Sequence, residues 1–405
     1  MEHRLVTGIQ KALGWDGPGP MGSTFSRGAL EDSTLVERML TPYRLLEVVR
    51  TRHLSNPQLR CYSEGRELLP SAYLSDVISR RKQSARRADM AAVGSILNSG
   101  GTLVLDTLDS FDPTMEVACR ALGWWSGELV GVNAYLAAGE TEGFRMHWDD
   151  HDVIAVQLAG EKSWEVRSAS RPAPMYRDAE PNVEPGDKVL WRGTMRTGDV
   201  MHIPRGYWHT ATRIGSGTDG FSLHVTFGFT KRTGITWIQH LADDARAHEL
   251  FRTDLEGLDD PEARSEQLVT ALAELAREHA PTRYLADIRK TSEPARHTPH
   301  VPAFGPLQSA VAVTEFEPVI TATGAAVIVE AAGKRLSFAP RAEAALRVLL
   351  SGHPVPLTHA DPDLLQVAEY LIKEGLCAPL SDESSSGYTG LVPPANYSKP
   401  LSTSA

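Results

Sequence analysis

Residues from about 101 to 230 form a succession of short β-rich runs, and this pattern constrains the fold more than any other feature of the chain. Runs such as LVGVNAYL, VIAVQL and FSLHVTFGF are separated by Gly, Pro and Asp, which favour turns. Many short strands at close spacing are typical of a β-barrel or a β-sandwich. The sequence therefore predicts a mainly β core over residues 96–230.

A His-x-Asp motif lies inside this region, in the segment FRMHWDDHDVIAVQL. Alternate side chains of a strand share a face, so His147 and Asp149 should project together while Trp148 points away. His209, in GDVMHIPRGYWHTA, is a third candidate ligand. Two His and one carboxylate on one side of an ion leave other positions open, as in non-haem Fe(II) oxygenases. These three ligands are the candidate catalytic and metal site.

Other interpretations of these residues stay open. A single His-x-Asp often arises by chance or forms hydrogen-bonded structure only. His147 and His151 have the i, i+4 spacing of zinc peptidases, but that motif needs a helix and a Glu where Trp148 stands. We interpret His202 as a packed or hydrogen-bonded strand residue and favour His209 as the third ligand.

Strand alternation places further polar groups on the same interior. In LVGVNAYL, Asn133 and Tyr135 lie opposite the apolar face. In EKSWEVR, Lys162 falls on the buried face beside Trp164, where an ammonium group needs an anionic partner such as a bound carboxylate. The polar face of FSLHVTFGF holds Ser222, His224, Thr226 and Gly228. The alternative is that these polar faces are in solvent, and it is weakest for Lys162.

These residues resemble the JmjC-type cupin oxygenases, specifically their ribosomal-oxygenase subgroup. His147-x-Asp149, Lys162 fifteen residues after the first His, and His209 after Pro-x-Gly-x-x match the family pattern, and Asn133 matches the subgroup. The resemblance implies a double-stranded β-helix core that binds Fe(II) through the three candidate ligands and uses 2-oxoglutarate as cosubstrate.

The resemblance also implies residue roles. Lys162 would bind the distal carboxylate of 2-oxoglutarate, Asn133 would contact the cosubstrate, and Tyr135 would touch the target peptide. Eukaryotic members have a serine in the strand after the second His, where this chain aligns Gly228. The hydroxyl contact is therefore absent or comes from Thr226. Asp150 and His151 either shape the mouth of the cavity or are ordinary loop residues.

The implied function is hydroxylation of an amino-acid side chain, with His and Arg as candidates, in a ribosomal protein or a ribosomally synthesised peptide. The formal net charge of −10 favours a basic peptide or protein partner and argues against nucleic acid. Two alternatives stay open. One is a metal-dependent cupin enzyme that does not use 2-oxoglutarate, and the other is a non-catalytic JmjC-like binding protein.

The rest of the chain divides into flanking modules. Residues 1–95 are expected to mix helices and strands, and the basic run SRRKQSARRADM is interpreted as a solvated helix face. Residues 231–295 are expected to be helical and to mediate a homodimer. Residues 305–380 are expected to form a winged-helix-like domain, and 381–405, rich in Ser, Pro and Gly, a disordered tail.

One helix of the dimerisation segment has clear end signals. Asp260 is a candidate N-cap with Pro261 at the first helical position. Leu268, Leu272 and Leu275 then recur on one face.

The chain also indicates its compartment. Its three cysteines are far apart and match no C-x-x-C pattern, which fits a reducing environment. The segment MEHRLVTGIQKALGWDG has early charges and no apolar run, so it resembles neither a signal peptide nor a membrane anchor. We therefore expect a cytoplasmic location without membrane association.

Overall fold

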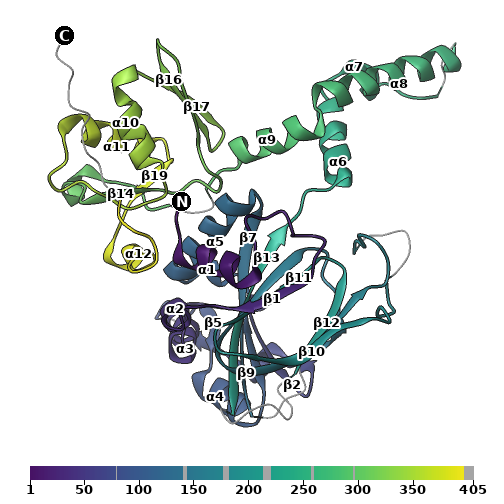
Figure 1. Ribbon diagram of the computed structural model, residues 1–405, viewed down its shortest axis with the longest axis vertical. Helices are drawn as coiled ribbons and strands as arrows, with labels where there is room; N and C mark the ends of the chain where they lie inside the picture. Colours follow the sequence, from purple (N-terminus) through teal and green to yellow (C-terminus); the bar gives the residue numbers. More distant parts are fainter. Residues whose placement is uncertain are drawn as a thin grey trace.

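The computed structural model describes residues 1–78, 80–139, 144–176, 182–212, 220–256, 260–294 and 297–395. Figure 1 shows a β-rich body, a projecting arm that carries α6 to α9, and a C-terminal module beside the arm. In the described part of the chain no helix is long and apolar enough to cross a bilayer.

A large antiparallel sheet forms one wall of the body. Its strands run in the order β1 (Ser26–Ala29), β11 (Asp199–Ile203), β9 (Asp152–Ala169), β13 (Phe221–Thr230), β7 (Leu129–Ala138), β6 (Thr102–Leu105), β2 (Leu59–Ser63) and β3 (Arg66–Glu67). The opposite wall contains β10 (Val189–Arg196), β12 (Tyr207–Thr212) and β8 (Phe144–His147). The predicted mainly β core is confirmed.

Strand β9 belongs to both walls. Its first half pairs with β11 and β13, and its second half pairs with β10 and β12. The strand changes wall near Gly160, whose φ is +63° and whose missing Cβ would lie 2.1 Å from the Phe221 carbonyl oxygen. Only glycine fits this backbone without strain. The runs VIAVQL and KSWEV are thus one bent strand.

Helices cover the outer face of the large sheet. They are α1 (Arg4–Leu13), α2 (Thr34–Met39), α3 (Pro42–Thr51), α4 (Met90–Asn98) and α5 (Pro113–Ser126). One apolar core joins α1 to α5 with the outward side chains of β7, β9 and β13, such as Val132, Ile154 and Phe227. Residues 1–95 therefore share their core with the catalytic region, and β1, β2 and β3 extend its sheet.

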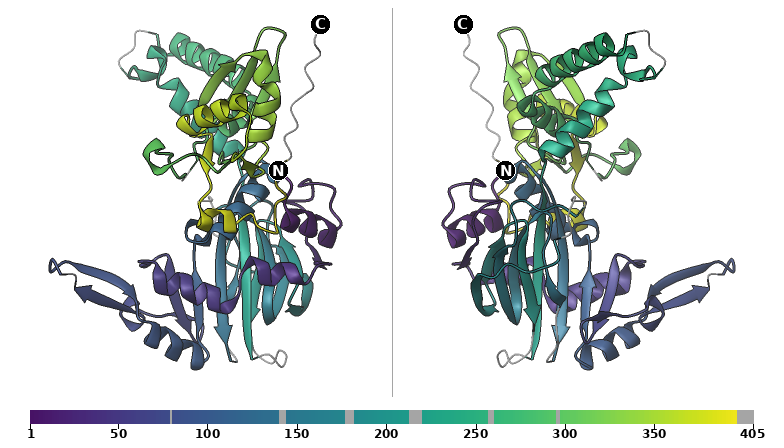
Figure 2. Two further views of the ribbon diagram at one scale, coloured as in Figure 1. Left: turned by 90° about the vertical axis from the view of Figure 1, so that its left-hand side faces the viewer. Right: turned by 90° about the vertical axis from the view of Figure 1, so that its right-hand side faces the viewer.

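The basic run near residue 80 is not helical, and this part of the prediction was wrong. Strands β4 (Leu74–Ile78) and β5 (Ser84–Ala88) pair as an antiparallel hairpin that projects from the body (Figure 2). Arg86 and Arg87 are exposed on β5. Arginines without apolar residues at helical spacing give no face to pack on the body, so the segment stays in solvent as a two-stranded ribbon.

The arm consists of α6 (Gly234–Ala245), α7 (Glu249–Arg252), α8 (Pro261–Glu278) and α9 (Pro281–Thr291). Asp260 caps α8 by accepting from the Ala263 amide, as predicted. Leu275 is buried, but Leu272 is 47% exposed, so the predicted apolar face of α8 is only partly covered.

The C-terminal module contains two small antiparallel sheets and two helices. The strands are β14 (Ser309–Ala312), β15 (Val319–Ala322), β16 (Val327–Ala331), β17 (Lys334–Phe338), β18 (Val355–Pro356) and β19 (Cys377–Pro379), and the helices are α10 (Glu343–Leu349) and α11 (Pro362–Lys373). The sheet orders are β18-β14-β19 and β15-β16-β17. The winged-helix-like assignment stays a prediction.

The segment after residue 380 is ordered as far as it is described, so the predicted disordered tail was wrong there. Helix α12 (Asp382–Ser386) is followed by Tyr388, Leu391 and Val392, which are buried in the main core. Arg120 of α5 donates a 2.8 Å hydrogen bond to the Tyr388 hydroxyl. Few apolar residues occur in this segment, so its Ser, Pro and Gly content led to the prediction of disorder. Residues 396–405 lie outside the described residues.

Candidate active site

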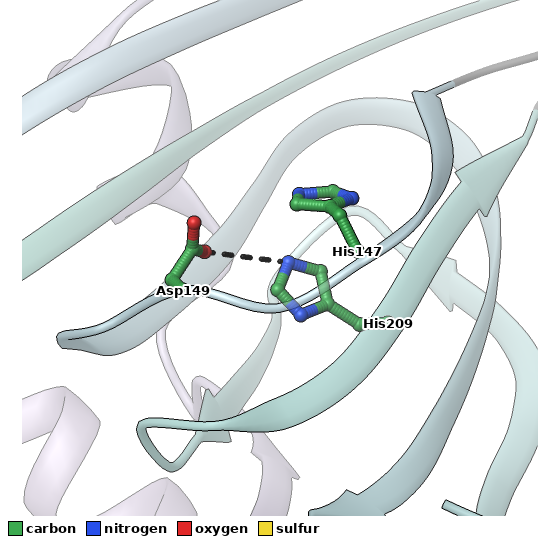
Figure 3. A group of neighbouring side chains, drawn as sticks. All are labelled: His147, Asp149 and His209. Atoms are coloured by element: carbon green, nitrogen blue, oxygen red, sulfur yellow. Dashed lines mark ion pairs between the residues drawn. The ribbon is translucent and has the colours of Figure 1, made fainter. Parts of the chain in front are cut away.

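His147 and His209 occupy a directly opposed pair of positions on β8 and β12. Opposed residues of antiparallel strands project from the same face, so both imidazoles enter the space between the walls. Their ring centroids are 4.3 Å apart (Figure 3). Cross-strand register, rather than proximity in sequence, thus brings the two rings together.

Main-chain carbonyls orient both rings. His147 Nδ1 lies 2.8 Å from the Arg145 carbonyl oxygen, and His209 Nδ1 lies 3.1 Å from the Tyr207 carbonyl oxygen. A carbonyl oxygen only accepts a hydrogen bond, so these contacts assign the N–H to Nδ1 and leave Nε2 with a lone pair. Metal-ligating histidines commonly show this arrangement.

Asp149 follows β8 and closes the group. Its Oδ2 lies 3.5 Å from His209 Nε2, and ligand atoms of all three residues lie within 4.8 Å of one another. The Gly206 amide donates a 2.8 Å hydrogen bond to the Asp149 carbonyl, which ties the residue to the turn before β12. The Tyr176 hydroxyl lies 3.3 Å from Asp149 Oδ1. Trp148 is not among the cavity-lining residues, as predicted from its pointing away, and its Nε1 donates a 2.9 Å hydrogen bond to the Asn182 carbonyl.

Burial, reinforced by the nearby His147, lowers the pKa of His209 to about 4. The imidazole is therefore neutral at physiological pH, which is the form that binds a metal.

His147, Asp149 and His209 line a cavity of about 120 Å³. The cavity is lined by every other residue that was predicted to bind the cosubstrate or the substrate. It is also lined by several residues for which no role was predicted. The lining residues are Tyr62, Gly65, Thr102, Asn133, Tyr135, Phe144, His147, Asp149, His151, Val153, Lys162, Trp164, Ile203, His209, Ala211, His224 and Thr226. Tyr62, Gly65 and Thr102 were missed because they precede the motif-bearing strands and carry no motif themselves.

Lys162 lies on the cavity side of β9 and is only 3% exposed. His224 lies near it, and burial followed by the charge of Lys162 holds the pKa of His224 well below its ordinary value. The cavity therefore presents one cation beside a neutral imidazole, an environment that favours a bound carboxylate. His224 was placed on the polar face by alternation, but only the structure brings it next to Lys162.

Neighbouring positions of β7 and β13 complete this wall. Thr226 pairs with Asn133, and His224 pairs with Tyr135, whose ring stacks on the imidazole with centroids 4.8 Å apart. Burial raises the pKa of Tyr135, so its hydroxyl stays protonated. The Thr107 amide donates a 3.0 Å hydrogen bond to Asn133 Oδ1, which fixes the amide group. Asn133, Tyr135 and Thr226 thus face the cavity that holds Lys162.

The His151 ring lies close to the backbone of Gly228. A Cβ on Gly228 would lie 3.0 Å from two atoms of the His151 ring. The Asp150 carboxylate lies 3.5 Å from His151 Nδ1. His151 lines the cavity, whereas Asp150 is not among the lining residues.

His202 is a buried, hydrogen-bonded histidine, as predicted. Its Nδ1 lies 2.8 Å from the Thr24 carbonyl oxygen and its Nε2 lies 3.1 Å from Asp152 Oδ1. Trp15 packs edge-on against the ring. Both nitrogens are therefore engaged away from the three candidate ligands.

Residues 111–236 match the family model of the JmjC domain. This region, less than half of the chain, therefore resembles a JmjC domain. Similar curated proteins include ribosomal oxygenase 1 of Gallus gallus, 31% identical over 150 residues, which are 36% of this chain and 24% of the relative. The bifunctional lysine-specific demethylase and histidyl-hydroxylase NO66 of Caenorhabditis briggsae is 28% identical over 222 residues, 53% of this chain and 27% of the relative. The chain thus spans about a quarter of the length of each.

Residues 111–236 and their flanks also resemble solved structures of the Escherichia coli ribosomal oxygenase YcfD. One has a TM-score of 0.56 at 16% identity and covers 94% of this chain and 100% of that chain. The same protein in complex with cobalt and 2-oxoglutarate has a TM-score of 0.50 at 16% identity, covering 84% and 90%. At this identity the likeness shows the fold. The resemblance predicted from the motifs and the JmjC cupin fold are thereby confirmed.

Proposed function

We propose that this chain is an Fe(II)- and 2-oxoglutarate-dependent oxygenase that hydroxylates an amino-acid side chain in a ribosomal protein or a ribosomally synthesised peptide. One observation carries the proposal. His147, Asp149 and His209 converge in the same cavity whose wall contains the buried Lys162. A metal site and a cation for a dicarboxylate thus share one small volume.

The residues present fit both groups. Two imidazoles with Nε2 available and one carboxylate are the ligands of non-haem Fe(II) oxygenases. Lys162 can pair with a carboxylate of 2-oxoglutarate, while Asn133, Thr226 and the neutral His224 offer uncharged polar contacts. With 2-oxoglutarate, bound Fe(II) supplies the activation of dioxygen that the protein's own side chains cannot provide.

The protein's contribution is placement and exclusion of water. The carbonyl contacts to Nδ1 hold both histidine rings before anything binds, so little reorganisation is needed. Trp164, Ile203 and Ala211 give the cavity an apolar part of its lining, to which Tyr62, Phe144 and His151 add aromatic rings. A target side chain entering this cavity is held beside the metal ligands in a fixed orientation.

The substrate class rests on the relatives and on charge. Two relatives are named as a ribosomal oxygenase and as a histidyl-hydroxylase, so a histidine side chain is the first candidate and arginine the second. The net charge of −10 suits a basic partner. Tyr135 and His151 are the proposed contacts to the target peptide.

Mass spectrometry tests this proposal. The Fe(II)-loaded chain is incubated with 2-oxoglutarate and either ribosomal proteins or candidate peptides. A mass increase of one oxygen atom on one residue, with matching succinate, supports it. The His147→Ala/Asp149→Ala variant is the control and should give neither product. Product without succinate would favour a cupin enzyme that does not use 2-oxoglutarate, and unchanged biological activity of His147→Ala would favour a non-catalytic binding protein.

The arm is proposed as the dimerisation segment, within residues 231–295. Among the described residues of the arm the buried apolar side chains are few, Leu241, Ala245, Leu275 and Tyr284, whereas Ile235, Ile238 and Val269 are 48%, 54% and 66% exposed. Contiguous exposed apolar patches are typical of a protein interface, and Ile235 and Ile238 are neighbours one turn apart on α6. Light scattering of Ile238→Glu should show a smaller species than the parent chain.

The remaining assignments are also proposals. The catalytic unit is residues 96–230, the C-terminal unit of 305–380 is winged-helix-like, and the protein acts in the cytoplasm. The buried free thiols of Cys61, Cys119 and Cys377 support a reducing location.

A further inference from the structure

A second cluster of potential metal ligands lies in the arm, far along the chain from the JmjC ligands. His240 and Asp244 are one turn apart on α6, and His279 is the C-cap residue of α8. Their ligand atoms lie within 4.8 Å of one another. His240 Nε2 is 3.1 Å and His279 Nδ1 is 3.2 Å from the same oxygen, Asp244 Oδ2.

The two histidines do not hydrogen-bond this oxygen, although both are close enough. Among the described residues Asp244 Oδ2 is buried and accepts no hydrogen bond. By contrast, His202 Nε2 makes an aligned hydrogen bond to Asp152 Oδ1 at the same 3.1 Å separation. The ring nitrogens of His240 and His279 are therefore directed beside the oxygen rather than at it. An ion at the point where the three atoms converge would satisfy them all.

The spacing and ligand types suit one class of ion. Two ligands each about 2.1 Å from a tetrahedral ion lie about 3.4 Å apart, close to the observed separations. Two imidazoles and one carboxylate are typical of Zn²⁺ with water in the fourth position, whereas Mg²⁺ and Ca²⁺ prefer oxygen ligands throughout. We propose that His240, Asp244 and His279 form a second, structural site for a Zn²⁺-like divalent ion.

The surroundings fit a structural role. Trp237 Nε1 donates a 2.7 Å hydrogen bond to the His279 carbonyl, and the His240 ring packs on Tyr284 of α9 with centroids 4.9 Å apart. Three helices thus meet at the cluster, where the described apolar core is small. An ion here joins α6 to the α8–α9 junction and sets the direction in which the arm leaves the body (Figure 1).

Metal titration of the full chain tests this inference independently of oxygenase activity. His147→Ala/Asp149→Ala removes two ligands of the JmjC site, so remaining tight binding reports the arm. In this background Co²⁺ should bind at one ion per chain with the visible absorption of a four-coordinate site. Adding Asp244→Asn should weaken the affinity at least about 100-fold, because even partners behind a ligand are worth about 10- to 100-fold. The matched control is Asp243→Asn, which changes an exposed carboxylate on the same helix and should leave binding intact.

Hydrogen exchange provides a second measurement. Zn²⁺ should slow exchange in α6 and α8 of the background protein and of the Asp243→Asn control, but not of Asp244→Asn. His240→Gln should reproduce the loss if Asp244→Asn disturbs the helices. Binding that is absent in the background, or that survives both Asp244→Asn and His240→Gln unchanged, overturns the inference.

Discussion

His147 and His209 face each other across the β8–β12 pair, and each holds its Nδ1 against the carbonyl oxygen two residues earlier in its own strand. The same local contact on two strands directs both Nε2 atoms toward Asp149. This pair is the geometric basis of the proposed iron site.

Removing one ring should abolish metal-dependent turnover. His209→Ala leaves His147 and Asp149 as a two-ligand site, and we expect Fe(II) affinity and succinate formation to fall at least about 100-fold, because weaker changes around metal ligands already cost about 10- to 100-fold. His202→Gln, at a buried histidine outside the cavity, should lower stability while leaving turnover per folded molecule unchanged. Equal loss of activity in both folded variants would contradict the assignment.

Lys162→Met should separate cosubstrate binding from metal binding. The variant removes the buried ammonium group but keeps most of its volume. A charge-assisted hydrogen bond contributes about 1.5–3 kcal/mol, so the KM for 2-oxoglutarate should rise about 10- to 100-fold. Fe(II) affinity without 2-oxoglutarate should stay within twofold. Steady-state kinetics and metal titration measure the two quantities, with the exposed Lys188→Met as control. An unchanged KM would exclude Lys162 as the carboxylate partner.

Gly160→Ala tests the bend that makes β9 part of both walls. A methyl group there would overlap the Phe221 carbonyl, and the backbone is left-handed. We expect a loss of about 3 kcal/mol in the free energy of unfolding, from left-handed strain of about 1–2 kcal/mol plus overpacking. Gly198→Ala is the matched control, since its φ is +94° but nothing lies within 4 Å. Urea unfolding should show a loss of only about 1–2 kcal/mol in the control; equal losses would refute the steric account.

Gly228→Ala should act through His151. The new methyl group would meet the imidazole at 3.0 Å and displace this part of the cavity lining. We expect a severalfold rise in the KM for the peptide, little change in the KM for 2-oxoglutarate, and no further effect when His151→Ala is already present. A double-mutant cycle measures this coupling. Additive effects would show that the two residues act separately.

His3 should make the folded protein sensitive to acid. Burial, with the charges of Arg38 and Arg4, lowers its pKa from 6.5 to about 4. Above pH 6.5 the ring is neutral in both states and stability is complete. As pH falls from 6.5 to 4 only the unfolded chain gains the proton, so stability decreases by up to about 3 kcal/mol. His3→Asn retains a good N-cap and should flatten this part of the pH profile, measured by urea unfolding. An unchanged slope would contradict this account.

The part of the site predicted from sequence is the part governed by strand alternation. The period of two placed Lys162 beside Trp164 on the buried face, and Asn133 opposite the apolar side chains of β7, as the structure shows. Alternation requires no knowledge of which strands are neighbours. The family resemblance supplied the fold and the roles.

The rest depended on long-range pairing that local pattern does not encode. The stacking of Tyr135 on His224 comes from the β7–β13 register, and Tyr62 reaches the cavity because β2 joins the sheet through β6. The tail was misjudged because a few buried side chains, such as Leu391, anchor an otherwise polar segment. The hairpin around Arg86 was misjudged because a charged run has no period that distinguishes an exposed helix from an exposed ribbon.

Anaerobic titration of the chain with Fe(II) and 2-oxoglutarate tests the central claim most directly. Chelation of iron by the 2-oxo acid gives a visible charge-transfer band. We predict one band-forming 2-oxoglutarate per chain in the parent protein, a requirement for about 10- to 100-fold more 2-oxoglutarate in Lys162→Met, and no band in His209→Ala. A parent protein without the band, or a band of full intensity in His209→Ala, would contradict the assignment of His147, Asp149 and His209 as the iron ligands.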